Sequence, residues 1–186
     1  MSNCGCGTEQ VEKLERKTLI SLLAINAVMF LVEFSMGWLA ESTGLISDSL
    51  DMLADTAVYG LSLYAIGRGL KKQIRAARLS GILQIILGTG VLLEVLRRLL
   101  LGSEPESLRI MVIGVIALVA NIYCLVLISG HRNSGVHMRA SWIFSTNDVI
   151  ANLGVIVSGF LVWLLGSRFP DLIVGAIISA VIVSGG

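Results

Sequence analysis

The chain has 186 residues, of which 55% are hydrophobic and 15% charged, and its formal net charge is +1. A soluble domain carries about a quarter of its residues as charged side chains and lacks apolar runs of about 20 residues, whereas this sequence has several such runs. The composition therefore excludes a soluble globular domain. The near-neutral charge, without a long basic run, also excludes nucleic acid as a partner.

Six apolar stretches follow one another along the chain, and each is about long enough to span the hydrocarbon core of a membrane as a helix. They cover residues 18–39, 45–66, 79–101, 108–128, 140–165 and 172–183. Backbone polar groups in lipid must be satisfied within their own segment, which predicts helices rather than strands. We therefore expect an all-α integral membrane protein, a six-transmembrane-helix bundle over residues 18–186 after a polar N-terminal segment, residues 1–17. The sixth stretch is barely long enough to cross, which leaves open whether the natural chain continues past Gly186.

Lysine and arginine are distributed unevenly between the two sides of this expected bundle. Residues 1–17, 67–78 and 130–139 share one side and hold ten of them, whereas the other side holds four. Positive residues are enriched on the cytoplasmic side of membrane proteins. The sequence therefore predicts a multi-pass protein with both the N-terminus and the C-terminus in the cytoplasm.

The second stretch carries three aspartates within eight positions, Asp48, Asp51 and Asp55. An aspartate near the centre of a membrane helix costs ~2.5–3.5 kcal/mol, while each Leu, Ile or Val returns only ~0.3–0.6 kcal/mol. At about 100° per residue, Asp51 and Asp55 lie about 40° apart, and Asp48 falls within about 60° of both. The three aspartates are therefore predicted to form one anionic stripe that faces a wet or cation-filled interior.

The fifth stretch repeats this spacing with Ser145, Asp148 and Asn152. Several carboxylates cannot share a low-dielectric site as anions unless protons or a multivalent cation neutralise them, so we expect a divalent metal ion. The alternative is that polar side chains only hydrogen-bond neighbouring helices, and it stays open for Ser145 and Asn152. For the aspartates it is disfavoured, because amides would join helices at a lower desolvation cost.

Other polar residues in the sequence have simpler interpretations. Glu94 lies one helical turn from two arginines, which predicts an ion pair, while Glu33 is either a buried hydrogen-bonded acid or a group that supports the site. Cys124 is expected to pack in the bundle. Cys4 and Cys6 either capture a soft ion at the cytoplasmic side or stay unliganded. The two histidines, His131 and His137, are expected in a solvated basic connector.

These motifs together resemble the cation diffusion facilitator family of proton-coupled divalent-metal exporters. The resemblance extends from Asn26 to the end of the chain and rests on three segments. The first stretch contains Asn26-Ala-Val-Met-Phe-Leu-Val-Glu33, the second Asp48-Ser-Leu-Asp51-Met-Leu-Ala-Asp55, and the fifth Asp148-Val-Ile-Ala-Asn-Leu-Gly154. The combination is specific, although any one segment would be a weak signal.

The resemblance implies a metal site with two ligands from the second helix and two from the fifth. Carried over residue by residue, it gives Asp51, Asp55 and Asp148 as ligands and places the fourth position at Phe144, which cannot bind a metal. The groups that could complete the coordination are a water or one of three further side chains, namely Asn152, Asp48 and Asn147. Family members also usually carry a C-terminal cytoplasmic metal-sensing domain, which this chain does not include.

The function implied by the resemblance is divalent metal efflux in exchange for protons, by alternating access, in a homodimer surrounded by membrane lipid. Zinc is the metal that the family favours, while a set of carboxylate oxygens also admits manganese, iron, cobalt or cadmium. Phe144 and the missing soluble domain favour one alternative, a non-transporting membrane metal-binding or regulatory protein of the same fold. An enzyme is not expected, because neither histidine lies within a membrane stretch.

Overall fold

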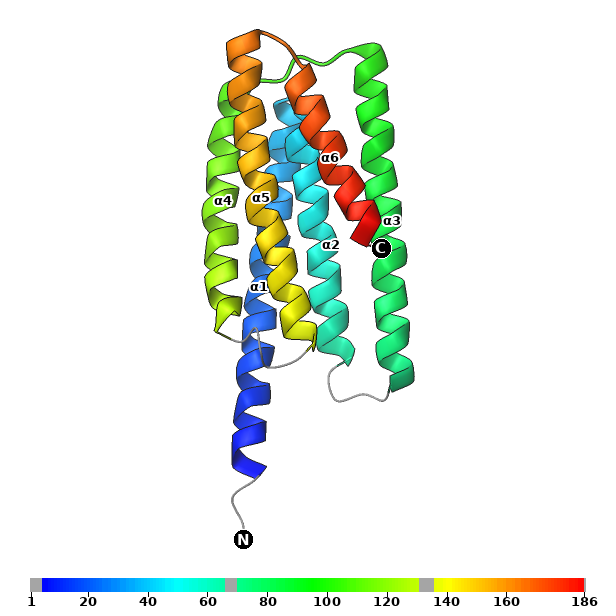
Figure 1. The fold of residues 1–186 in the computed structure, drawn as a ribbon, viewed down its shortest axis with the longest axis vertical. Coiled ribbons are helices and arrows are strands. Elements are labelled where there is room, and N and C mark those ends of the chain that lie inside the picture. The colour runs from blue at the N-terminus through cyan, green and yellow to red at the C-terminus, as the bar shows by residue number, and fades with distance from the viewer. Residues whose placement is uncertain (1–4, 66–69, 131–135, 186) are drawn as a thin grey trace.

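The computed structural model describes residues 5–65, 70–130 and 136–185, and six helices make up almost all of them (Figure 1). They are α1 (Gly5–Leu39), α2 (Thr43–Ala65), α3 (Leu70–Leu101), α4 (Ser107–Ser129), α5 (Val136–Leu165) and α6 (Phe169–Gly185). Successive helices run in opposite directions along one bundle, which confirms the predicted all-α, six-helix fold. We call the end of the bundle where α1, α3 and α5 finish the upper end, and the end nearer the N-terminus the lower end.

All six helices begin before the apolar stretches predicted for them, and α1, α3 and α5 begin at least four residues before. Helix α1 has 35 residues and α3 has 32, so both extend below the apolar part of their sequence. Residues 70–78 were expected to form a connector, but they contain no proline or glycine and consist largely of good helix formers such as Lys, Arg, Ala and Leu. This polar segment therefore continues α3 beyond the apolar stretch, since no residue in it ends the helix.

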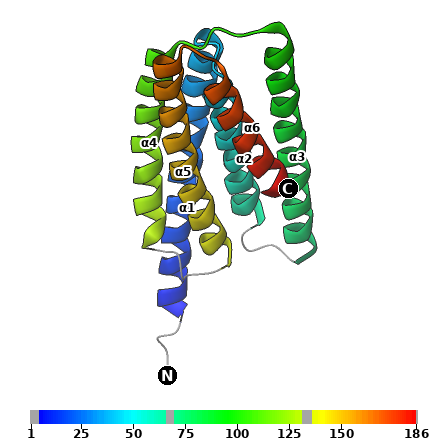
Figure 2. The ribbon, with the colours of Figure 1, turned by 45° about the horizontal axis from the view of Figure 1, so that its top comes forward.

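Helix α2 occupies the centre of the bundle and contacts each of the other helices (Figures 1 and 2). Helices α1, α4 and α5 cover one side of it. Helix α3 stands apart from these three and packs mainly against α2 and α6, while α6 also contacts α5. The pair α3 and α6 is thus joined to the remaining helices through α2 and α5.

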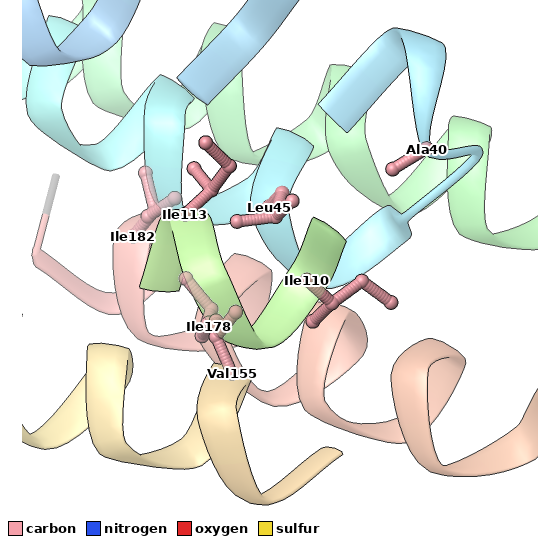
Figure 3. Packing of buried hydrophobic residues seen from close by; sticks show 7 residues of the cluster. All are labelled: Ala40, Leu45, Ile110, Ile113, Val155, Ile178 and Ile182. Atoms are coloured by element: carbon pink, nitrogen blue, oxygen red, sulfur yellow. The ribbon is translucent and has the colours of Figure 1, made fainter. Parts of the chain in front are cut away.

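The core is divided into apolar clusters at different heights. The upper core cluster joins α1, α2, α4, α5 and α6, and its side chains are shown in Figure 3. Its buried members are Ala40, Leu45, Ile110, Ile113, Val155, Ile178 and Ile182. A lower core cluster joins α1, α2 and α4 through Leu19, Leu22, Tyr59, Cys124 and Ile128. Cys124 is fully buried there, so the predicted packing role is confirmed.

The outside of the bundle is apolar, as expected for a surface in contact with lipid. Large hydrophobic side chains such as Leu31, Leu93, Val119 and Trp163 are more than half exposed. Four helices, α1, α3, α4 and α5, are long and apolar enough to cross a membrane, and α6 forms a shorter apolar helix. Helix α2 differs because its three aspartates break the apolar run. The chain is therefore a multi-pass membrane protein whose central helix carries three aspartates.

The connection between α1 and α2 is a tight turn at the upper end. The N–H of Ser42 donates to the Gly37 carbonyl over 2.9 Å, and Glu41 adopts the left-handed conformation with φ of 48°. This pattern is a Schellman turn, in which a glycine usually takes the left-handed position. Gly44 instead lies inside the first turn of α2, where Asp171 of α6 packs against it.

Candidate metal centre

Two of the predicted ligands face each other across the contact between α2 and α5. The carboxyl group of Asp148 lies beside that of Asp55, close enough to share a hydrogen bond when one of the two carries a proton. Both side chains are almost completely buried, with exposed fractions of 2% for Asp55 and 3% for Asp148. The structure therefore brings together one carboxylate from each of the two helices that the sequence selected.

Tyr59 closes the lower side of this pair. Its hydroxyl donates a hydrogen bond of 3.0 Å to Oδ2 of Asp55, one helical turn away on α2, and its ring belongs to the lower core cluster. The sequence analysis did not select Tyr59. The available signal was its position four residues after Asp55, which places it on the same face of the helix as the aspartate stripe.

Asp51 lies one turn above Asp55 and is more accessible than the other two aspartates. It forms part of the wall of a cavity of about 250 Å³ between α2, α5 and α6. Exposed side chains, including Asn147 and Ile150, line the same cavity, so it reaches the surface of the bundle. Asp51 is also an electrostatic neighbour of both Asp55 and Asp148. A cation that enters the cavity would therefore meet Asp51 before it meets the buried pair.

The three predicted ligands are neighbours, but they do not enclose a common point. Within residues 5–65, 70–130 and 136–185, no group of three or more His, Cys, Asp or Glu side chains is positioned to hold a metal ion. The aspartates instead follow the stripe, with Asp55 and Asp148 paired and Asp51 at the cavity. Binding a cation with all three would require side-chain rotation or a small shift of α2 against α5.

The substitute ligands occupy different positions around this stripe. Asn152 is fully buried and donates from Nδ2 to the backbone carbonyl of Asp148 over 2.8 Å, which leaves Oδ1 without a donor. Asn147 is exposed in the cavity wall. Phe144 is partly buried one turn below Asp148 on α5. Asn152 therefore offers a buried oxygen that no donor satisfies, while Asn147 shares the cavity with Asp51.

Asp48 is paired differently from the other aspartates of the stripe. Its carboxyl group lies beside that of Glu33 on α1, and exposed fractions are 1% for Asp48 and 0% for Glu33. No hydrogen-bond donor reaches either carboxylate oxygen of Glu33 in the described structure. Glu33 is thus a buried acid paired with another acid, and the pair continues the carboxylate stripe from α2 to α1.

Unpartnered acceptor oxygens are concentrated in the interior around α2. Buried acceptors normally find a donor, so oxygens without one indicate a proton, a water or a cation that would satisfy them. The buried oxygens without a hydrogen-bond donor in the described part of the chain include Oδ1 of Asn26, both carboxylate oxygens of Glu33, Oδ2 of Asp48, Oδ2 of Asp148 and Oδ1 of Asn152. Carboxylate and amide oxygens are ligands suited to divalent cations.

The remaining predicted polar residues lie away from this interior. Glu94 accepts bonds of 2.7 Å from both Arg97 and Arg98, which confirms the predicted ion pair. His131 and Cys4 fall outside the described residues, and the described part of the structure does not include the side chains of Cys6 and His137.

Comparison with known proteins identifies the family of this chain. Residues 19–186 match the family model described as the cation efflux transmembrane domain. The chain belongs to this family. The match begins within α1 and continues through α6, and it confirms the family that the aspartate motifs indicated.

Several curated relatives of this cation efflux domain are named as metal transporters. The vacuolar zinc transporter of Saccharomyces cerevisiae is 29% identical over 136 residues, which cover 66% of this chain and 31% of the relative. The zinc transporter ZitB of Yersinia pseudotuberculosis is 23% identical over 180 residues, covering 90% of this chain and 58% of the relative. A cadmium, cobalt and zinc/H⁺–K⁺ antiporter of Bacillus velezensis is 24% identical over 182 residues, which cover 90% of this chain and 58% of the relative. The chain thus spans less than two thirds of the length of the relatives that it matches.

Proposed function

We propose that this protein moves divalent metal cations out of the cytoplasm and that Asp51, Asp55 and Asp148 bind the cation on its way. The observation that carries the proposal is the buried Asp55–Asp148 pair on facing helices, next to a cavity whose wall contains Asp51. Ionised carboxylates in a membrane interior are costly unless a cation or protons neutralise them. Membership of the cation efflux family supports the same conclusion.

Proton exchange follows from the chemistry of these side chains. A carboxylate must lose its proton to bind a metal, so protons and metal ions compete for the same oxygens. If the bundle alternately opens its two ends, a metal ion bound from the cytoplasm is released where protons are more abundant. The relative from Bacillus velezensis, named as an antiporter that uses H⁺, supports this part of the proposal. The mechanism is secondary active transport, not an enzymatic reaction.

Zinc is the cation that we propose first, because relatives are named as zinc transporters. Three carboxylates with Asn152 or water would form an all-oxygen set, which also accepts harder divalent ions such as manganese. The orientation that we propose places the lower end in the cytoplasm, since that end carries most of the lysine and arginine. We further propose that residues 18–186 form the transport domain, residues 1–17 a cytoplasmic segment, and the functional unit a homodimer.

The test is Zn²⁺ flux into liposomes that contain the purified chain, measured with an encapsulated zinc indicator under an imposed pH gradient. We expect flux to depend on the gradient and to fall at least tenfold in D55N and in D148N. The control is S35A, because Ser35 is exposed on α1 and donates only to its own helix at Leu31. Unchanged flux in both aspartate variants would refute the site.

A second function is favoured by one observation, the side chain of Phe144 at the position where the family has a ligand. A bundle with an incomplete site could bind a metal without moving it, as a membrane metal-binding or regulatory protein does. Calorimetric titration of Zn²⁺ beside the flux assay separates the two functions. Binding that Asp148→Asn removes, with no flux in the unmodified chain, would establish the second function instead of the first.

A further inference from the structure

A single carboxylate from α6 holds the start of α2 at the upper end of the bundle. Asp171 is fully buried and accepts three hydrogen bonds, from Oγ of Ser42 at 2.6 Å, the N–H of Thr43 at 2.5 Å and the N–H of Gly44 at 3.1 Å. The first N–H groups of a helix have no partner within the helix, so a side chain usually caps them. Here the cap comes from a helix about 130 residues later in the chain.

The contact between the two helices continues below this cap. An added Cβ at Gly175 of α6 would lie only 3.1 Å from the backbone carbon and oxygen of Thr43, so the helices meet backbone to backbone. Oγ of Ser47 also donates to the Gly175 carbonyl over 3.0 Å. We call the contact formed by Asp171 and Gly175 with residues 42–47 the upper clasp.

The upper clasp and the upper core cluster together close the bundle above the aspartates. The cavity at Asp51 lies between α2, α5 and the middle of α6, and Ile178 of the upper core cluster forms part of its wall. Asp51 itself lies one helical turn below Ser47, so an ion bound there has the upper clasp between it and the upper end. Release at the upper end requires that this contact separate.

Two features suit the upper clasp to opening. Its contacts are mainly hydrogen bonds, and it joins α2 to a helix of the separate α3–α6 pair. Hydrogen bonds to a carboxylate can be replaced by water when a contact opens, whereas separating apolar side chains exposes them. Helix α6 packs with α3 as a pair that reaches the rest of the bundle only through α2 and α5 among the main helix contacts. The pair can therefore swing away from α2 without disturbing the packing of α1 against α4.

We propose that Asp171 is a positioning residue that fastens an upper gate, and that the upper clasp opens each time an ion leaves through the upper end. This inference rests on the proposed transport function. When closed, the clasp holds α2 and its aspartates in the geometry described above. When open, it separates α6 from the turn between α1 and α2 and gives the upper side access to Asp51.

The first test is a reversible cross-link across the upper clasp. In a chain carrying C4S, C6S and C124A, the pair T43C and G175C is oxidised to a disulfide, since an added Cβ at Gly175 lies 2.8 Å from Cγ2 of Thr43. The matched control is the pair I110C and G159C between α4 and α5, where the corresponding Cβ lies 3.1 Å from Cβ of Ile110. Both sites fit a disulfide after small helix shifts.

We expect oxidation of the clasp pair to lower Zn²⁺ flux at least tenfold, with Zn²⁺ binding retained and flux restored by reduction. The control pair keeps its flux within twofold when oxidised. If the oxidised clasp pair transports as fast as the reduced one, the clasp is a permanent joint and the proposal is overturned.

The second test measures access from the upper side and needs no flux. Ala151 lines the cavity, so A151C in the chain carrying C4S, C6S and C124A reports access when a membrane-impermeant thiol reagent is added to one face of sealed vesicles. We expect D171N to raise labelling from the upper face at least tenfold and S42A to raise it less, while labelling from the lower face stays unchanged. The control S184A removes only an exposed hydroxyl that donates to Val181 within α6, away from the clasp.

The two tests separate the gate from the transport function. No increase in upper-face labelling with D171N overturns the gate, whatever the flux. Equal increases at both faces also overturn it, because they indicate general loosening of the bundle. An unmodified chain without Zn²⁺ flux would instead refute the proposed transport, since the labelling result does not depend on flux.

Discussion

The contact between α3 and α6 can be tested by two glycines that lie two residues apart on α3. An added Cβ at Gly88 would lie 2.6 Å from Cγ2 of Val183 and 3.1 Å from both the Ser179 carbonyl oxygen and the Val183 nitrogen. At Gly90 an added Cβ would meet nothing within 4 Å. The substitutions G88A and G90A therefore make the same chemical change in the same helix, one against the backbone of α6 and one in open space.

The two variants should change stability in opposite directions. Overpacking at a close contact costs about 1–3 kcal/mol, and at Gly88 the obstacle includes the backbone of α6, which cannot rotate aside. Replacing an exposed helical glycine by alanine stabilises by about 0.5–1 kcal/mol. The gain in helix propensity is common to both variants, so they should differ by the overpacking cost of about 1–3 kcal/mol. With a shift of ~2–4 °C per kcal/mol for a domain of this length, their unfolding temperatures should differ by roughly 2–12 °C.

The measurement is thermal unfolding of both variants and the unmodified chain in one detergent, followed by circular dichroism. G88A should unfold at a lower temperature than the unmodified chain and G90A at a slightly higher one. If G88A were neutral or stabilising, α6 could not pass as close to α3 as the structure shows. The pairing of α3 with α6, on which the gate depends, would then be wrong.

Two further predictions concern the site and the charged upper end. F144H should tighten Zn²⁺ binding by roughly tenfold in calorimetry, because it adds an imidazole ligand one turn from Asp148, while F160H on the exposed side of α5 should not. Equal affinities in the two variants would contradict the position of the missing ligand. R98A should destabilise the protein by about 3 kcal/mol in thermal unfolding, since its side chain is 5% exposed, whereas R97A, at 52% exposed, should have a much smaller effect. Similar losses in both would show that burial does not decide the strength of this ion pair.

The sequence alone determined the architecture and the residues of interest. Most of the apolar stretches are long enough to cross a membrane by themselves, and lipid leaves the backbone no alternative to a helix, so six helices could be predicted without knowing their packing. The aspartates could be selected for a similarly local reason, because the cost of placing a carboxylate in lipid does not depend on its eventual neighbours. The ion pair of Glu94 was also predictable, since its partners lie within one helical turn.

Tertiary structure decided which of these groups meet. The spacing along α2 placed Asp48, Asp51 and Asp55 on one stripe, but only the packing of α1 and α5 on α2 pairs Asp48 with Glu33 and Asp55 with Asp148, and leaves Asp51 at a cavity. The cap by Asp171 had no sequence signal, because a helix start is normally capped by its own neighbouring residues. Contacts between helices depend on the rotation and height of each helix in the bundle, and no single stretch of sequence contains that information.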